Sequence, residues 1–233
     1  MPGTRGRWRR VTPAPREGER RLFVAIALPA AVAGQVVQLV DRVRAQMRVE
    51  ATPAEQRREV RWVRLDALHL TLRFLGPTEV VRVPDVEAAV AAAARRSQPA
   101  EVGLHGAGSF PPVGRPRVLW LGLQTGADAL ARLAADLNEE LVTRGWASDD
   151  RHLRAHLTLA RADGVAAGPH TAALLARAAA ELEVAFSADR LSLFESVPMP
   201  AQPARYVPLV EVALGAGSSR STGQASGVRT TGG

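Results

Sequence analysis

The chain contains one tetrapeptide twice: His-Leu-Thr-Leu at residues 69–72, within HLTLRFLG, and His-Leu-Thr-Leu at residues 156–159, within HLTLAR. Side chains alternate between the two faces of a β-strand, so the histidine and threonine of each copy share one face and the two leucines occupy the other. Each copy therefore anchors itself in a core and presents an imidazole beside a hydroxyl. Two such strands that face each other across a cleft would form a symmetric site.

A pair of histidines suits the in-line cleavage of a phosphodiester. One neutral imidazole accepts a proton from water, and the other, as imidazolium, donates a proton to the leaving alkoxide. The sequence therefore predicts His69 and His156 as an acid–base pair. The hydroxyls of Thr71 and Thr158 are placed to hydrogen-bond the non-bridging phosphate oxygens, and a nearby arginine would stabilise the developing negative charge.

Candidate substrate-binding residues lie close to the motifs or carry rings. Arg73 and Arg161 are the arginines nearest to the two motifs. Aromatic faces often hold the bases of single-stranded RNA, although packing in the core is the more common use of such rings. The rings considered for stacking are Phe74, Phe110, Trp120 and Phe194. The resulting set of substrate-binding candidates is Arg73, Phe74, His105 and Arg161.

The sequence predicts no metal centre and no cofactor. There are no cysteines, which excludes disulfides, thiolate nucleophiles and cysteine-ligated metal sites. His152 and His156 are four residues apart, a spacing that would place two metal ligands on one face of a helix. The Leu-Thr-Leu that follows His156 favours a strand instead.

Hydrophobic periodicity predicts an α+β fold with roughly four helices and eight strands. The expected helices span residues 30–49, 84–96, 127–144 and 170–182. The expected β-like runs span residues 21–28, 60–76 with a break near residue 66, 103–110, 118–123, 156–161, 186–197 and 205–214. Gly76-Pro77 is a turn signal that is expected to end the second of these runs.

Charge is concentrated in the tails. The formal net charge is +7, of which residues 1–20 hold +4 and residues 215–233 hold +2, so residues 21–214 carry only +1. We expect a disordered basic arm over 1–20, one domain over 21–214 and a disordered Gly/Ser/Thr-rich tail over 215–233. The arm favours RNA weakly, because contacts between basic residues and phosphates are independent of sequence and are screened by salt.

The start of the domain imitates a secretion signal, because Arg20-Arg21 precedes the apolar run LFVAIALPAAVAG. The run is too short to cross a bilayer and is interrupted by Pro29. A buried first strand is the preferred interpretation, and the sequence predicts a cytoplasmic protein that does not associate with membranes.

These motifs and their flanks resemble the two-histidine phosphoesterases, specifically the RNA 2′,3′-cyclic phosphodiesterases that are also called 2′-5′ RNA ligases. The resemblance covers about residues 21–214: RLFVAIALP, the two motifs with their flanks, LSLFESV and RYVPL. It implies a bilobal fold with two pseudo-symmetric lobes, each an antiparallel sheet flanked by helices, and a central cleft. It also implies metal-independent hydrolysis of a 2′,3′-cyclic phosphate to a 2′-phosphomonoester.

The resemblance further assigns roles to residues. His69 corresponds to the proton donor and His156 to the acceptor, and Arg161 matches an arginine that recurs after the second motif. The chain departs from the family pattern just before that motif, where Arg154 and Ala155 replace an aromatic residue and a proline. This departure leaves the approach to His156 less constrained.

The expected partners are RNA ends that bear a 2′,3′-cyclic phosphate, or related cyclic nucleotides, and the chain is expected to be a monomer. Two alternatives stay open within the same fold: 2′-5′ RNA ligation, and hydrolysis of another cyclic nucleotide. A third is a non-catalytic protein that binds RNA ends. The presence of both histidines and both threonines disfavours the third alternative, since binding alone needs no acid–base pair.

Overall fold

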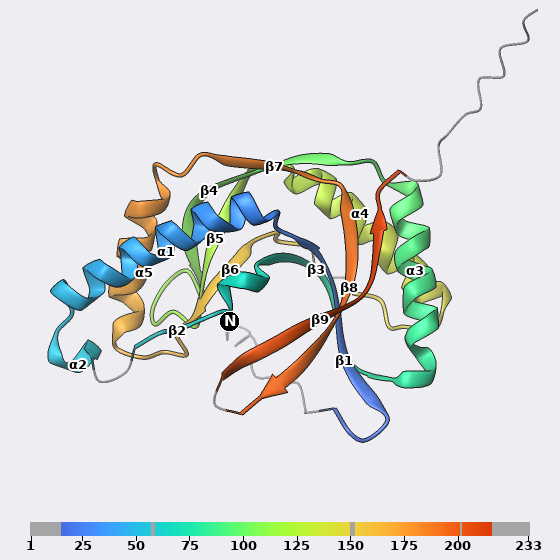
Figure 1. Cartoon of the computed structure of the whole chain (residues 1–233), viewed down its shortest axis with the longest axis horizontal. Coiled ribbons are helices and arrows are strands. Elements are labelled where there is room, and N and C mark those ends of the chain that lie inside the picture. The colour runs from blue at the N-terminus through green and yellow to red at the C-terminus, as the bar shows by residue number, and fades with distance from the viewer. Residues whose placement is uncertain (1–14, 57–58, 150–151, 201, 216–233) are drawn as a thin grey trace, which may run out of the picture.

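The computed structural model describes residues 15–56, 59–149, 152–200 and 202–215. Within them, nine strands form one curled antiparallel sheet in the order β7-β4-β5-β6-β3-β1-β8-β9, with β2 paired to β6 (Figure 1). The strands are β1 (Glu19–Ala27), β2 (Arg61–Trp62), β3 (His69–Glu79), β4 (Ala100–Phe110), β5 (Val118–Thr125), β6 (Leu157–Arg161), β7 (Val184–Ala188), β8 (Arg190–Met199) and β9 (Gln202–Ala213).

Helices cover the sheet in two pairs. The helical segments are α1 (Ala30–Glu50), α2 (Pro53–Gln56), α3 (Val83–Arg96), α4 (Ala127–Thr143) and α5 (Ala167–Ala179), with 3₁₀ turns η1 (Leu65–Ala67) and η2 (Val80–Arg82). The helices α1 and α5 pack on each other and on β7 and β4, whereas α3 and α4 pack on each other and on β3, β8 and β9. No helix in the described ranges has the length and apolar character that a membrane span requires.

The two helix pairs define two lobes, which confirms the predicted α+β bilobal fold. One lobe contains β1, β3, β8 and β9 with α3 and α4, and the other contains β2, β4, β5, β6 and β7 with α1 and α5. The lobes share one continuous sheet, because β3 and β6 pair at Leu70 and Leu157. The two strands that carry the repeated tetrapeptide therefore lie at the junction of the lobes.

The amphipathic patterns of the long helices account for the core. Leucines of α4 repeat at three- and four-residue spacing and all face the sheet: Leu130, Leu133, Leu137 and Leu141. The apolar side of α1 is buried in the same way, at Val32, Val36, Leu39, Val40 and Val43. Both stripes are those expected from helical periodicity.

The turn predicted at Gly76-Pro77 is wrong, since β3 continues through both residues to Glu79. Gly76 adopts a φ of +78°, which glycine tolerates, and Pro77 pairs with Arg21 of β1. The other edge of β3 is paired only at Leu70, so no strand beside Pro77 on that edge requires the backbone N–H that proline lacks.

Two other predicted boundaries shift. The run expected over 186–197 divides at Asp189 into β7, which belongs to one lobe, and β8, which belongs to the other. The first strand begins at Glu19, two residues earlier than predicted. Most of the two predicted tails, residues 1–14 and 216–233, lies outside the described residues.

Candidate functional site

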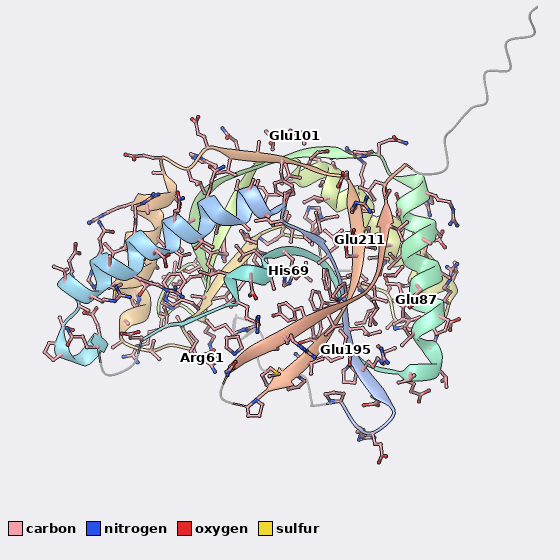
Figure 2. All side chains as sticks on the ribbon, viewed as in Figure 1. Arg61, His69, Glu87, Glu101, Glu195 and Glu211 are labelled. Carbon is pink, nitrogen blue, oxygen red and sulfur yellow. The ribbon has the colours of Figure 1, made fainter. Side chains whose placement is uncertain are left out.

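The two tetrapeptides are cross-strand neighbours. Their first leucines, Leu70 and Leu157, pair with each other and are fully buried in the core beneath the helices. Because the strands are antiparallel, this register places the histidine of each motif opposite the threonine of the other. All four polar side chains lie on the sheet face that the helices leave uncovered. His69, which is labelled in Figure 2, lies near the centre of the molecule.

Both imidazoles are held by the same backbone contact. The Nδ1 of His69 lies 2.9 Å from the carbonyl oxygen of Ala67, and the Nδ1 of His156 lies 2.6 Å from the carbonyl oxygen of Arg154. A carbonyl oxygen only accepts, so Nδ1 donates its proton in each case. The Nε2 of each neutral ring is therefore the nitrogen that is free to exchange a proton.

Three aromatic rings surround His69. The ring centroid of Phe23 lies 4.8 Å away, Tyr206 approaches edge-on at 5.0 Å, and Phe194 lies at 6.2 Å. Sequence analysis selected Phe194 but missed Phe23 and Tyr206. Their proximity depends on the strand order β3-β1-β8-β9, which places residues from both ends of the chain beside the first motif.

Two aromatic rings surround His156. Phe110 approaches it edge-on at 5.0 Å, and the centroid of Trp120 lies 6.1 Å away. Both are among the rings considered above for stacking a base. The guanidinium carbon of Arg154 lies 5.5 Å from the centroid of the Phe110 ring, so one residue at which this chain departs from the family pattern packs against a ring beside the second histidine.

Burial shifts both histidines in the same direction. Desolvation lowers the pKa of His69 below its usual value, and the hydrogen bond to the Ala67 carbonyl opposes this shift. Desolvation also lowers the pKa of His156; the hydrogen bond to the Arg154 carbonyl opposes it, and the positive charge of Arg154 adds to it. Both environments therefore favour the neutral imidazole.

A β-bulge occurs at the fourth residue of each motif. Leu72 is an extra residue opposite β1, and Leu159 is an extra residue opposite β5. A bulge reverses the alternation of faces, so the next residue on the site face comes three positions after the threonine instead of two. Phe74 and Arg161 therefore share the face of the histidines, as the sequence analysis proposed for a substrate-binding site.

Arg73 lies on the opposite face, which corrects its assignment as a substrate-binding candidate. Its side chain is buried, one guanidinium nitrogen lies 2.8 Å from the Asp149 carboxylate, and another donates to the Ala147 carbonyl oxygen at 2.6 Å. Strict alternation from His69 would have kept Arg73 on the site face. The bulge at Leu72 removes it, and Arg73 instead ties β3 to the segment after α4.

His105 is also held away from the motifs. Its Nδ1 lies 3.3 Å from the carbonyl oxygen of Leu182, where α5 leads into β7. His152 precedes β6 in an irregular segment, not on a helix. Among the described residues, no three His, Cys, Asp or Glu side chains are grouped so as to hold a metal ion.

A glycine allows Trp120 to lie beside His156. A Cβ on Gly108, its partner on β4, would overlap the Trp120 ring. We expect Gly108→Ala to displace the indole and to lower the free energy of unfolding by about 1–3 kcal/mol, as overpacking does. Chemical denaturation measures the loss. Gly34→Ala in α1 is the control, because no atom lies within 4 Å of its added Cβ and alanine favours a helix; equal effects of the two substitutions would contradict the prediction.

The sequence pattern of the 2′-5′ RNA ligase superfamily matches residues 28–197. The chain belongs to this superfamily. Curated relatives named RNA 2′,3′-cyclic phosphodiesterase include the Thermus thermophilus protein, 35% identical over 150 residues, which are 60% of this chain and 68% of that protein. The Escherichia coli protein of the same name is 34% identical over 143 residues, 61% of this chain and 72% of its own.

Other relatives are matched over less of their length. The Aeropyrum pernix protein, which has the same name, is 35% identical over 96 residues, 41% of this chain and 53% of that protein. The chain thus spans about half the length of this relative. The match to the Geobacillus stearothermophilus protein spans 32% of that relative.

Solved structures of the superfamily share the fold. The structure of the Thermus thermophilus protein TT0787 superposes with a TM-score of 0.63 at 26% identity, covering 84% of this chain and 98% of that one. Escherichia coli LigT complexed with 3′-AMP superposes with a TM-score of 0.58 at 26% identity, with the same coverage. These likenesses extend over both lobes of the sheet.

Proposed function

We propose that this superfamily member hydrolyses the 2′,3′-cyclic phosphate at RNA ends to a 2′-phosphomonoester without a metal ion. The observation that carries the proposal is the reciprocal register at Leu70 and Leu157, which sets each histidine opposite the other motif's threonine. The names of the curated relatives support the reaction. The complex of LigT with 3′-AMP supports a nucleotide phosphate as the ligand.

In the proposed reaction His156 accepts a proton from the attacking water through Nε2. The oxygen of that water bonds to phosphorus as the bond to the 3′ oxygen breaks, and His69 donates a proton to the 3′ oxygen. Thr71 and Thr158 donate hydrogen bonds to the non-bridging oxygens, and Arg161 stabilises the added negative charge. Two imidazoles thus supply both proton transfers, which is why the proposed reaction requires no Lewis acid.

The direct test is to incubate the purified protein, in the presence of EDTA, with an oligoribonucleotide that ends in a 2′,3′-cyclic phosphate. We expect a product one water heavier, with its phosphate on the 2′ oxygen, identified by mass and by sensitivity to phosphatase. A 3′-phosphate product would contradict the assignment of the leaving group. No turnover would contradict hydrolysis of RNA ends and favour another cyclic nucleotide or a binding function.

The superfamily name favours one second candidate, the joining of RNA ends by a 2′-5′ bond. This reaction uses the same acid–base pair, with a 5′ hydroxyl in place of water as the nucleophile. Adding an oligoribonucleotide with a 5′ hydroxyl to the same incubation tests it. A longer product with a 2′-5′ bond would support ligation.

Burial of both histidines predicts an acidic optimum. The base must be neutral and therefore works above its pKa, whereas the acid must be protonated and therefore works below its pKa. Since desolvation lowers both pKa values, we expect a bell-shaped profile of kcat/KM centred below pH 6.5. Bound phosphate favours imidazolium, so the kcat profile should lie at higher pH. Steady-state kinetics between pH 4.5 and pH 9 measure both profiles, and a flat kcat/KM profile would contradict two titrating imidazoles.

A further inference from the structure

Arg21 of β1 lies on the face of the sheet that carries the site. It lies two residues before Phe23 on the same strand, so the two side chains point to the same face of the sheet. The Phe23 ring packs against His69. Its guanidinium carbon lies 5.0 Å from the centroid of Phe74, the ring that the bulge after the first motif brings to this face. Arg21 and Phe74 therefore form one end of the site.

Among the described residues, the guanidinium of Arg21 has no hydrogen-bond partner at Nε, which is buried, and no ion-pair partner. Its sequence neighbour Arg20 points to the other face and forms an ion pair with Glu195 at 3.5 Å. Within the described residues, the protein therefore supplies a carboxylate partner to Arg20 but not to the adjacent Arg21.

The positive charge of Arg161, on β6 of the other lobe, also acts on Arg21. Burial, and next the positive charge of Arg161, lower the pKa of Arg21, while Tyr206 acts in the opposite direction. Within the described ranges Arg161 also forms no ion pair. Arg21 is partly buried, whereas Arg161 is exposed. Like charges destabilise each other, and an anion bound beside Arg21 would relieve that repulsion.

The distance along β1 separates Arg21 from the reacting phosphate. Ile26 pairs with Leu70 at the centre of the site, and Arg21 lies five residues further along β1, about 16 Å of extended strand. An arginine side chain is too short to cover that span. This spacing favours a second phosphate, one nucleotide away from the one between the histidines, as the anion beside Arg21.

We propose that Arg21, stacked on Phe74, binds the phosphodiester immediately 5′ to the cyclic end, so that the site prefers an oligoribonucleotide to a cyclic mononucleotide. This inference rests on the proposed function and identifies its substrate class. The Phe74 ring holds the guanidinium in place through a cation–π contact. Phosphate is a suitable ligand because the planar guanidinium donates two parallel hydrogen bonds to its oxygens.

The test compares two substrates that differ by one nucleotide: cytidine 2′,3′-cyclic phosphate, and the dinucleotide that ends in the same group. Arg21→Met removes the charge and keeps an apolar chain over Phe74, and Arg20→Met is the matched control. We expect Arg21→Met to lower kcat/KM for the dinucleotide about tenfold or more, mainly through KM, as the loss of a charged hydrogen bond would. For the mononucleotide, kcat/KM of Arg21→Met should stay within about twofold of the wild-type value. Arg20→Met should change neither substrate's kinetics.

A variant that keeps the charge guards against a change in folding. Arg21→Lys should retain most of the preference for the dinucleotide, with an unfolding transition like that of the wild type. An equal fall on both substrates for Arg21→Met would overturn the inference, because Arg21 would then act on the reacting phosphate or on the fold. Unchanged kinetics on both substrates would also overturn it.

Equilibrium binding separates this inference from the proposed reaction. The probe is the dinucleotide with a terminal 2′-phosphate, titrated at several salt concentrations. If Arg21 contacts one phosphate, the Arg21→Met variant should bind this probe more weakly than the wild type. The plot of log K against log salt concentration should also be less steep for the variant, by about 0.7. If the wild type cleaves neither cyclic substrate but this difference in slope is found, the reaction fails and the phosphate contact stands. An unchanged slope overturns the contact.

Discussion

His69→Ala and His156→Ala each lower kcat on a 2′,3′-cyclic phosphate end by about 10²- to 10⁴-fold, the range that general acid–base catalysis contributes. Each substitution removes one of the two proton transfers. KM changes little, because the threonine hydroxyls and Arg161 still bind the phosphate. Since the histidines act as a unit, the double variant should be little worse than the weaker single variant. Single-turnover kinetics with excess enzyme measure the chemical step directly.

The matched control is His105→Ala, which removes an imidazole that is bonded to the Leu182 carbonyl and lies away from both motifs. Its kcat should stay near that of the wild type. If His69→Ala or His156→Ala retained wild-type kcat, the acid–base assignment would be wrong. If both variants lost binding and turnover together, the histidines would serve mainly to hold the substrate.

Arg73→Met lowers the free energy of unfolding by about 2–3 kcal/mol and leaves kcat/KM of the folded enzyme unchanged. The side chains of Arg73 and Asp149 are only 10% and 21% exposed, so removing the guanidinium takes one ion pair from a poorly solvated carboxylate. The remaining exposure of Asp149 keeps the loss below that of a fully buried pair. Urea denaturation monitored by tryptophan fluorescence gives the stability, and steady-state kinetics give the activity.

Two further variants make this prediction specific. Asp149→Asn combined with Arg73→Met should recover part of the lost stability, because the carboxylate that lost the ion pair with Arg73 is then neutral. Arg61→Met removes a guanidinium that is 74% exposed and paired with Asp163, and should leave stability nearly unchanged. A large rise in KM for Arg73→Met at wild-type stability would instead return Arg73 to the substrate site.

Much of the fold follows from local patterns in the sequence. The four long helices were predicted because their apolar residues repeat at helical spacing, and the leucines of the two motifs were predicted to be buried because strand side chains alternate. The turn at Gly76-Pro77 was predicted wrongly, because whether a glycine and a proline end a strand depends on the neighbouring strands. A proline is tolerated within β3 where the adjacent edge is unpaired, and pairing is a property of the sheet.

The candidate site was predicted less completely than the fold. Alternation holds from His69 to Thr71 and fails at Leu72, so the rule that links the motif residues assigned Arg73 to the wrong face. No residue type at Leu72 or Leu159 signals a bulge, because leucine is equally suited to regular strand. The structure shows a bulge at the fourth residue of both motifs, and this recurrence connects the bulge with the site.

Contacts that join the two ends of the chain were not predictable by spacing. Tyr206 reaches His69 because β9 and β8 return beside β1, and the charge of Arg161 acts on Arg21 because β6 and β1 both pair with β3. Sequence analysis assigned Arg21 to the first strand or to an imitation of a secretion signal. Neither interpretation connects it with an arginine that lies 140 positions later.

The interleaving of the lobes has a consequence for the order of events on the ribosome. Both tetrapeptides have been synthesised once Arg161 has been added, but neither lobe is then complete. One still lacks α5 and β7, and the other lacks β8, which pairs with β1, and β9, which pairs with β8. A nascent chain therefore carries both histidines well before it can position them, and the site is complete only after α5, β7, β8 and β9 have been added.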